Sequence, residues 1–162
     1  MSVDLVTAAP RAVWSSGAGR LLFGGSRNDQ RGFAIHPRPY LLLEDGSAHE
    51  LLLETHPRWT DDGWIRGEFL LPVIAPGDHF TARFGFIQPQ GPPQTNGVTI
   101  TVVCEGRTVA GLAKRYTGRL DELSVDLSRF AGGGRVVAVE VGADGDSTQD
   151  WLVWTRMTVG RA

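Results

Sequence analysis

The stretch Val139-Glu-Val-Gly-Ala-Asp-Gly-Asp-Ser-Thr-Gln-Asp-Trp-Leu-Val-Trp-Thr-Arg-Met-Thr-Val159 contains the pattern that decides the predicted fold. Two apolar runs, 136–141 and 151–159, flank a polar segment with two glycines and three aspartates. Short apolar runs separated by such a segment are typical of two β-strands joined by a loop. We therefore expect a β-sheet protein in which the last long strand follows an acidic loop.

Tryptophans occur on both faces of this closing strand. Side chains alternate between the two faces of a strand. Over 151–159 this alternation places Trp151 and Met157 on one face, and Trp154 and Arg156 on the other. At most one face is expected to be fully buried. We nevertheless expect both of these tryptophans, and Trp14, to be core residues, because packing is the usual fate of large rings.

Similar apolar runs, separated by glycine, proline and acidic residues, fill the rest of the chain. Hairpins are expected between 40–43 and 50–53, around Asp45-Gly46, and between 80–86 and 98–105. No segment carries a sustained helical stripe. The pattern favours an all-β, two-sheet antiparallel jelly-roll β-sandwich. Further strands are predicted at 2–7, 11–15, 21–23, 32–36, 64–71, 108–114 and 123–127.

Length and composition are those of an ordinary globular domain, expected to span 1–162. The 162 residues are 41% hydrophobic and carry a formal net charge of -2, which gives no indication of nucleic-acid binding. No apolar run is long enough for a membrane span, and no signal peptide is recognisable. A full-length chain is therefore expected in the cytoplasm, and a piece of a secreted protein outside the cell. Cys104 is the single cysteine, so it cannot form an internal disulfide and is expected in the core.

Three segments near the C-terminus carry a family resemblance. They read Val125-Asp-Leu-Ser-Arg-Phe-Ala-Gly132, Val136-Val-Ala-Val-Glu-Val-Gly-Ala-Asp-Gly-Asp-Ser147 and Gln149-Asp-Trp-Leu-Val-Trp154. They resemble the C-terminal third of jelly-roll carbohydrate-binding modules, most closely the novel putative carbohydrate-binding module (NPCBM) family and the related malectin-like domains. The chain lacks that family's "GIGTH"-type segment. The resemblance implies a non-catalytic module that binds a carbohydrate or glycan.

A loop with two tryptophans is the expected ligand site. Pyranose faces are apolar and stack on aromatic rings, and binding residues concentrate on loops of a rigid scaffold. Charged neighbours in this loop could hydrogen-bond sugar hydroxyls. The alternative is that both rings cover the end of the core. The predicted ligand-binding residues are His56, Arg58, Trp59, Asp61, Asp62 and Trp64.

The acidic loop suggests a metal. Asp144, Asp146 and Asp150 bring three carboxylates close together in the chain, and carboxylate and carbonyl oxygens are the ligands that calcium takes. The sequence lacks the EF-hand glycine and terminal glutamate. The alternative is a solvated turn whose carboxylates cap backbone amides. A structural calcium is the only cofactor that the sequence suggests.

Catalysis is not expected. The chain has no nucleophile elbow, zinc-protease helix motif, phosphate loop or Cys-x-x-Cys pair. Asp61 and Asp62 are adjacent, whereas a glycosidase needs two carboxyls at a controlled separation across a cleft. The four histidines are dispersed: His36, His49, His56 and His79. The alternative to sugar binding is a protein-interaction or sensor module of a larger protein, because fold does not determine function.

Overall fold

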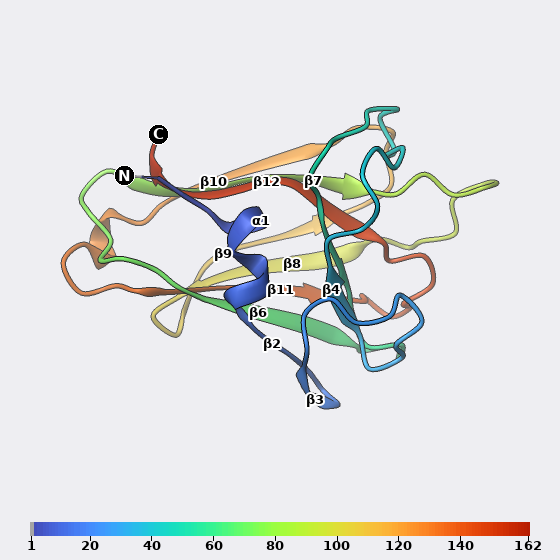
Figure 1. Cartoon of the computed structure of the whole chain (residues 1–162), viewed down its shortest axis with the longest axis horizontal. Coiled ribbons are helices and arrows are strands. Elements are labelled where there is room, and N and C mark those ends of the chain that lie inside the picture. The colour runs from blue at the N-terminus through green and yellow to red at the C-terminus, as the bar shows by residue number, and fades with distance from the viewer. Residues whose placement is uncertain (1) are drawn as a thin grey trace.

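The computed structural model describes residues 2–162. It consists of two antiparallel sheets packed face to face (Figure 1). The first sheet has the order β10-β7-β12-β5-β4, with β1 paired to β12, and the second has the order β3-β2-β6-β11-β8-β9. This confirms the predicted sandwich. The first sheet consists of β1 (Ser2–Asp4), β4 (Phe33–Ile35), β5 (Leu53–His56), β7 (Asp78–Phe86), β10 (Asp121–Asp126) and β12 (Leu152–Arg161). The second consists of β2 (Val13–Ser16), β3 (Gly19–Leu21), β6 (Trp64–Leu70), β8 (Val98–Cys104), β9 (Arg107–Lys114) and β11 (Val136–Gly142).

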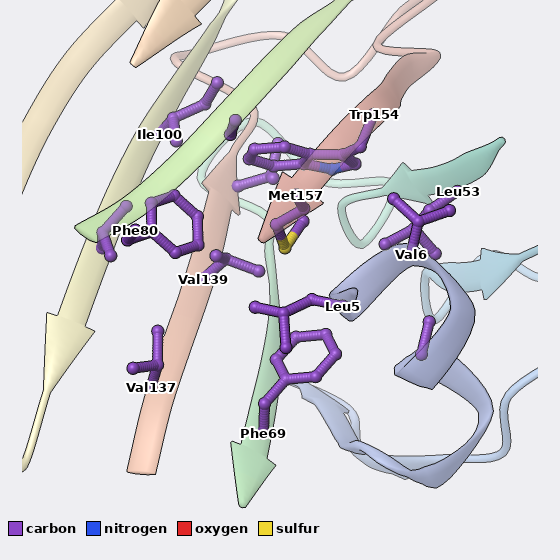
Figure 2. Packing of buried hydrophobic residues seen from close by; sticks show 14 of the residues in the cluster. Leu5, Val6, Leu53, Phe69, Phe80, Ile100, Val137, Val139, Trp154 and Met157 are labelled. Atoms are coloured by element: carbon purple, nitrogen blue, oxygen red, sulfur yellow. The ribbon is translucent and has the colours of Figure 1, made fainter. Parts of the chain in front are cut away.

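The main core lies between the two sheets (Figure 2). Alternating residues of β7 and β8 point into it and are buried, as the sequence pattern predicts. Trp14 and Trp154 are its largest side chains, and each indole nitrogen has a partner: Trp14 donates to the carbonyl of Ala9 at 2.9 Å, and Trp154 to the hydroxyl of Thr55 at 3.0 Å. Cys104 is a buried free thiol, so the prediction of a core cysteine is confirmed.

The predicted alternation of the closing strand is wrong after Trp154. The register of β12 against β7 shifts between Trp154 and Arg156, which is a β-bulge. A bulge inserts one extra residue and reverses the faces beyond it. Met157 and Val159 therefore join Trp154 in the main core, whereas Val153 packs in a second cluster on the outer face of the sheet.

The predicted hairpin between β7 and β8 is wrong. β7 pairs with β10 and β12 in the first sheet, and β8 pairs with β9 and β11 in the second. The segment 87–97 therefore crosses from one sheet to the other. Both strands bury one face in the same core, and alternation cannot distinguish neighbours within a sheet from strands that face each other across a sandwich.

The predicted hairpin between 40–43 and 50–53 is also wrong. The turn forms: Gly46 has a φ of 79°, and the amide of Leu43 donates to the carbonyl of Ser47 at 3.0 Å. The segments 40–43 and 50–53 on either side of it do not pair as strands. Instead, Leu43 bridges to Ile87. The segment folds over the outer face of the first sheet because its leucines have a second small core to fill. That core contains Leu41, Leu43, Leu52, Ile87 and Val153.

The predicted strand over 2–7 is correct for 2–4 and wrong for 5–7. β1 ends at Asp4, and the chain then enters a one-turn helix, α1 (Leu5–Ala8), followed by the 3-10 turn η1 (Ala9–Arg11). The carboxylate of Asp4 caps this helix by accepting from the amides of Val6 and Thr7. A second 3-10 turn, η2 (Ser128–Phe130), precedes β11. No helix within residues 2–162 is long and apolar enough to cross a membrane.

Replacing Gly67 tests how tightly the Trp14 ring packs over the neighbouring strand of its own sheet. A Cβ at Gly67 of β6 would lie 2.6 Å from ring carbons of Trp14, which is fully buried and cannot move away freely. Gly67→Ala is expected to lower the free energy of unfolding by about 1–3 kcal/mol through overpacking, measured by urea denaturation. The control is Gly111→Ala in β9, where the nearest atom, the carbonyl oxygen of Ile100, is 3.9 Å away. Its effect should stay within about 0.5 kcal/mol, and equal effects of the two changes would contradict this packing.

Candidate functional site

Four loops leave the sheets at the same end of the sandwich, on the right in Figure 1. Their common position follows from the register. The start of β6 pairs with the end of β11 at Trp64 and Gly142, and the start of β8 pairs there too, through Thr99. We call this end the rim. Its loops are 57–63, 87–97, 115–120 and 143–151.

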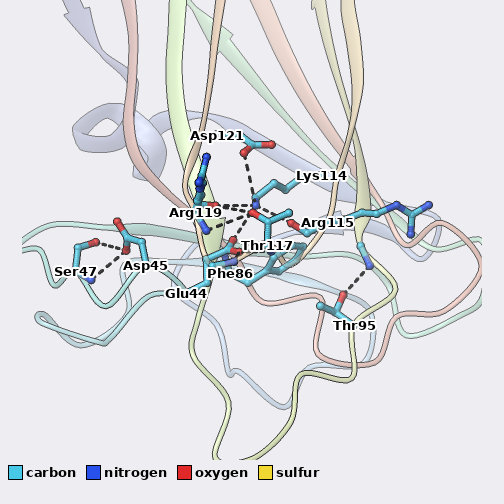
Figure 3. Close-up of polar contacts among 12 residues, drawn as sticks. Glu44, Asp45, Ser47, Phe86, Thr95, Lys114, Arg115, Thr117, Arg119 and Asp121 are labelled. Atoms are coloured by element: carbon cyan, nitrogen blue, oxygen red, sulfur yellow. Dashed lines mark hydrogen bonds and ion pairs between the residues drawn. The ribbon is translucent and has the colours of Figure 1, made fainter.

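A buried ion pair fixes part of the rim (Figure 3). The ammonium of Lys114, at the end of β9, lies 2.9 Å from a carboxylate oxygen of Glu44, and both side chains are completely buried. The same ammonium donates to the carbonyls of Arg115 at 2.7 Å and Arg119 at 2.9 Å. Lys114 therefore holds the loop 115–120 against the segment that carries Glu44.

Glu44 connects the same region to the backbone of the first sheet. One oxygen accepts the amide of Phe86 at 2.9 Å, and the other accepts the amides of Thr117 at 2.8 Å and Gly118 at 3.0 Å. A buried ion pair is tolerated only when further hydrogen bonds satisfy its charges. Both charges are satisfied here, and the segment around Glu44 is fixed against two other chain segments.

An open groove of about 790 Å³ lies beside this anchor. Its walls are formed by Arg38 and 40–42, by 87–92, and by Gln149 and Trp151, together with Arg27 and Gln94. These stretches come from distant parts of the sequence. Two backbone hydrogen bonds hold the walls together. The main-chain amide of Gln88 donates to the carbonyl of Leu42 at 2.9 Å, and that of Ile87 donates to the carbonyl of Trp151 at 3.1 Å.

Two aromatic rings and several long polar side chains line the groove. Tyr40 is 62% exposed and adopts a φ of 61°, although it is not a glycine. Backbone in this region is unfavourable for a bulky residue and occurs where the surroundings impose it, often at binding sites. Trp151 is the second ring, and it is only partly buried, contrary to the predicted core position. The glutamines are Gln88, Gln90, Gln94 and Gln149.

Arg27 is held beside Trp151. Its Nε and Nη2 donate to the two carboxylate oxygens of Glu54, each at 3.0 Å, and its guanidinium carbon lies 6.0 Å from the ring centroid of Trp151. Glu54 is fully buried, and burial raises its pKa while Arg27 opposes the shift. The paired carboxylate thus fixes the orientation of Arg27 toward the groove.

His56, a predicted ligand-binding residue, lies in the interior. It is 4% exposed, and its ring stacks on Phe33 with centroids 5.2 Å apart and lies 5.8 Å from the ring of Trp59. Burial lowers its pKa to about 4, so the imidazole is neutral at neutral pH. His56 therefore supports Trp59, which is 41% exposed, from beneath.

The other predicted residues do not converge around one cavity with Trp59. Trp64 is 37% exposed and lines a shallow depression of about 240 Å³ on the outer face of the second sheet, with Thr99 and Glu140. Arg58 lies near Trp64, since both side chains approach Gly17. Asp61 and Asp62 are exposed, and the carbonyl of Asp61 accepts the amide of Gly145.

The acidic loop contains both a turn cap and a buried carboxylate. Asp146 accepts the amide of Thr148 at 2.9 Å and its hydroxyl at 2.7 Å, and these bonds lower its pKa. Asp150 is fully buried, and burial, with the charges of Asp146 and Asp144, raises its pKa to about 8. Residues 2–162 contain no group of three His, Cys, Asp or Glu side chains placed to hold a metal ion.

Two buried oxygens beside this loop lack hydrogen-bond partners. They are Oδ2 of Asp150 and Oδ1 of Asn96, and no other buried side-chain atom within the described residues is in this state. The other oxygen of Asp150 accepts the hydroxyl of Thr95 at 2.7 Å, and the Asn96 amide donates to the carbonyl of Asp144 at 2.6 Å. Oδ1 of Asn96 is an acceptor, and Oδ2 of Asp150 is an acceptor when its carboxyl is ionised, so a bound cation would satisfy both atoms.

Sequence reasoning missed the groove. The sequence pattern predicts Tyr40 in a strand, Trp151 in the core and only a hairpin connection between 80–86 and 98–105. A signal was available in the Pro37-Arg38-Pro39-Tyr40 stretch, where two prolines before an aromatic residue disfavour a central strand. Nothing local indicates that this stretch faces Trp151.

Comparisons with known proteins show the fold. No family model matches the sequence, and no curated protein matches it. Among solved structures, CBM51 from Clostridium perfringens GH95 in complex with methyl-galactose is 15% identical with a TM-score of 0.63, over 99% of this chain and 100% of that one.

Two further structures agree. The CBM51-2 and INT domains from Clostridium perfringens ZmpB are 16% identical with a TM-score of 0.63, over 99% of this chain, which spans 32% of that structure. TmCBM61 in complex with β-1,4-galactotriose is 12% identical with a TM-score of 0.56, over 92% of this chain and 88% of that one. At such identities these matches establish a shared β-sandwich fold.

Removing the charge of Glu44 tests the anchor. Glu44→Gln leaves the buried Lys114 ammonium with only the more distant, partly exposed carboxylate of Asp121, at 3.8 Å, and is expected to lower the free energy of unfolding by about 3–5 kcal/mol in urea denaturation. The control is Glu122→Gln, which removes an exposed partner 3.7 Å from Arg83 and should cost no more than about 1 kcal/mol. A loss at Glu44 no larger than that at Glu122 would show that the buried pair does not hold the rim.

Proposed function

We propose that the chain is a non-catalytic carbohydrate-binding module that holds a sugar in the rim groove. The observation that carries this proposal is the pairing of Tyr40 and Trp151 with glutamine and arginine side chains around one open groove. Carbohydrate-binding modules with this fold are described in complex with methyl-galactose and β-1,4-galactotriose. The C-terminal resemblance to NPCBM and malectin-like modules supports the same proposal.

The groove has the chemistry that a sugar requires. Tyrosine and tryptophan rings offer apolar faces with a polar edge, on which a pyranose stacks while its hydroxyls stay hydrated. Glutamine amides donate and accept, and arginine donates in a fixed fork, so both suit ring hydroxyls. The volume of about 790 Å³ lies within the usual range for small-molecule sites.

The same lining supports a binding role over hydrolysis. A glycosidase uses two carboxyl groups across the scissile bond, one as acid and the other as base or nucleophile. None of the side chains that line the groove is a carboxylate. The loop around Trp59 is the second candidate position for a sugar, because that ring is exposed and supported by His56.

We also propose a structural calcium at the acidic loop, with Oδ2 of Asp150 and Oδ1 of Asn96 as its core ligands. These buried acceptors lack partners, and calcium takes carboxylate, amide and carbonyl oxygens. Asp146 is a second carboxylate in the same loop, and its charge contributes to the raised pKa of Asp150. The ion would fix the segment that carries Gln149 and Trp151 into the groove.

Ring removal tests the position of the sugar. Tyr40→Ala and Trp151→Ala should each weaken binding of the best glycan from an array by roughly two- to tenfold, the amount expected from a lost aromatic contact. Titration of intrinsic fluorescence measures Tyr40→Ala, and calorimetry measures Trp151→Ala. Trp59→Ala is the matched control and should change affinity less than twofold. The reverse pattern would place the sugar at the 57–63 loop, and a screen without any glycan bound would remove the proposed function.

Calcium titration tests the metal. A cation that binds only the native state should raise the melting temperature, by several degrees when calcium is at roughly 100 times its Kd. Asp150→Asn should abolish the increase, whereas Asp62→Asn, in the neighbouring loop, should keep it. An unchanged melting temperature of the wild-type protein at millimolar calcium would exclude the site.

A further inference from the structure

The rim groove is lined by cationic and no acidic side chains in a chain that is acidic overall. Two of its lining side chains, Arg27 and Arg38, are cationic and none is acidic, whereas the whole chain has a net charge of -2. Carboxylates line the other polar depressions. Glu140 lies beside Trp64, and the hollow at the 117–122 turn contains Asp121 and Glu122.

Arg27 has hydrogen-bonding capacity left after it pairs with Glu54. The ion pair uses the Nε–H of Arg27 and one N–H of its Nη2. Within residues 2–162 no group accepts a hydrogen bond from its Nη1. The side chain is 47% exposed although Glu54 beneath it is fully buried. The carboxylate thus holds the guanidinium in place, and the outward edge of the fork faces solvent.

Arg38 carries a charge that the protein does not neutralise. It is exposed, and no ion pair or hydrogen bond from any residue in 2–162 occupies its side chain. It lies between Pro37 and Pro39, whose rings restrict the backbone on both sides. A restricted backbone reduces the entropy lost when this side chain is ordered by a ligand.

We propose that the groove selects anionic glycans, whose sugars carry a carboxylate or sulfate group; this inference rests on the proposed function of the groove. Arginine is suited to these groups because its planar fork forms two parallel charge-assisted hydrogen bonds with an oxyanion. The guanidinium of Arg27 lies 6.0 Å from the Trp151 ring centroid. Because this guanidinium lies over the ring, a sugar that contacts Trp151 beside it has its substituents within reach of a fixed guanidinium, and Arg38 supplies the unneutralised charge.

A glycan array followed by matched titrations tests this selectivity. The array carries neutral, uronate-containing, sialylated and sulfated glycans, so that its classes separate carboxylate from sulfate recognition. Each anionic binder is then titrated beside its neutral counterpart, the methyl ester for a carboxylate and the desulfated sugar for a sulfate. The anionic form is expected to bind about tenfold more tightly at low salt, and the difference should shrink at 0.5 M NaCl.

Two charge variants assign the effect to the groove. Arg38→Gln should weaken binding of the anionic form about fivefold more than it weakens binding of the neutral counterpart, because only the anionic form loses a charge-assisted contact. Arg107→Gln, an exposed arginine at the start of β9 and outside the groove, should change neither. Arg27→Gln is avoided because it would leave the buried Glu54 without its partner.

The outcomes separate the two proposals. Preferential binding of anionic glycans, lost in Arg38→Gln, supports the inference. Equal or better binding of neutral glycans overturns it and leaves the proposed sugar site intact. Binding of no glycan in any class overturns the proposed function itself.

Discussion

The buried contact between Glu44 and Lys114 is the constraint on which the rim depends. It joins the segment before β5, the end of β7 and the loop between β9 and β10, none of which are neighbours in sequence. A buried ion pair is costly unless hydrogen bonds satisfy its polar atoms, and five backbone groups beyond the 2.9 Å contact do this here. The geometry of the pair therefore specifies one arrangement of these segments.

The groove is a consequence of that arrangement and of a second hydrophobic core. With Glu44 fixed, the leucines on either side of it pack on Val153 and Ile87, outside the first sheet. The chain between 38 and 42 then forms a wall, with Tyr40 forced into left-handed backbone geometry and exposed to solvent. Glu54, buried beneath, aligns Arg27 along the opposite side. A sandwich of common type thus acquires a site through one loop that folds over its outer face.

Much of the fold was predictable because burial repeats at short range. Strands such as β7 and β8 alternate so regularly that their existence and inward faces follow from the sequence. Their partners do not follow, since pairing in a sandwich joins distant segments. The reversal of the inward and outward faces of β12 after Trp154 could not be predicted for the same reason, because a bulge depends on the partner strand. The candidate site was less predictable still: Trp59 is exposed as a ligand residue should be, but His56 is core, and the groove residues meet only in three dimensions.

The central claim is that the rim groove receives the sugar. Backbone amide chemical shifts, followed as the strongest-binding glycan is titrated into the labelled protein, test this claim most directly. The account predicts that the largest changes map to 38–42, 87–92 and 149–151, the three walls of the groove. Changes centred instead on the depression beside Trp64 and Glu140, with the groove walls unperturbed, would contradict it.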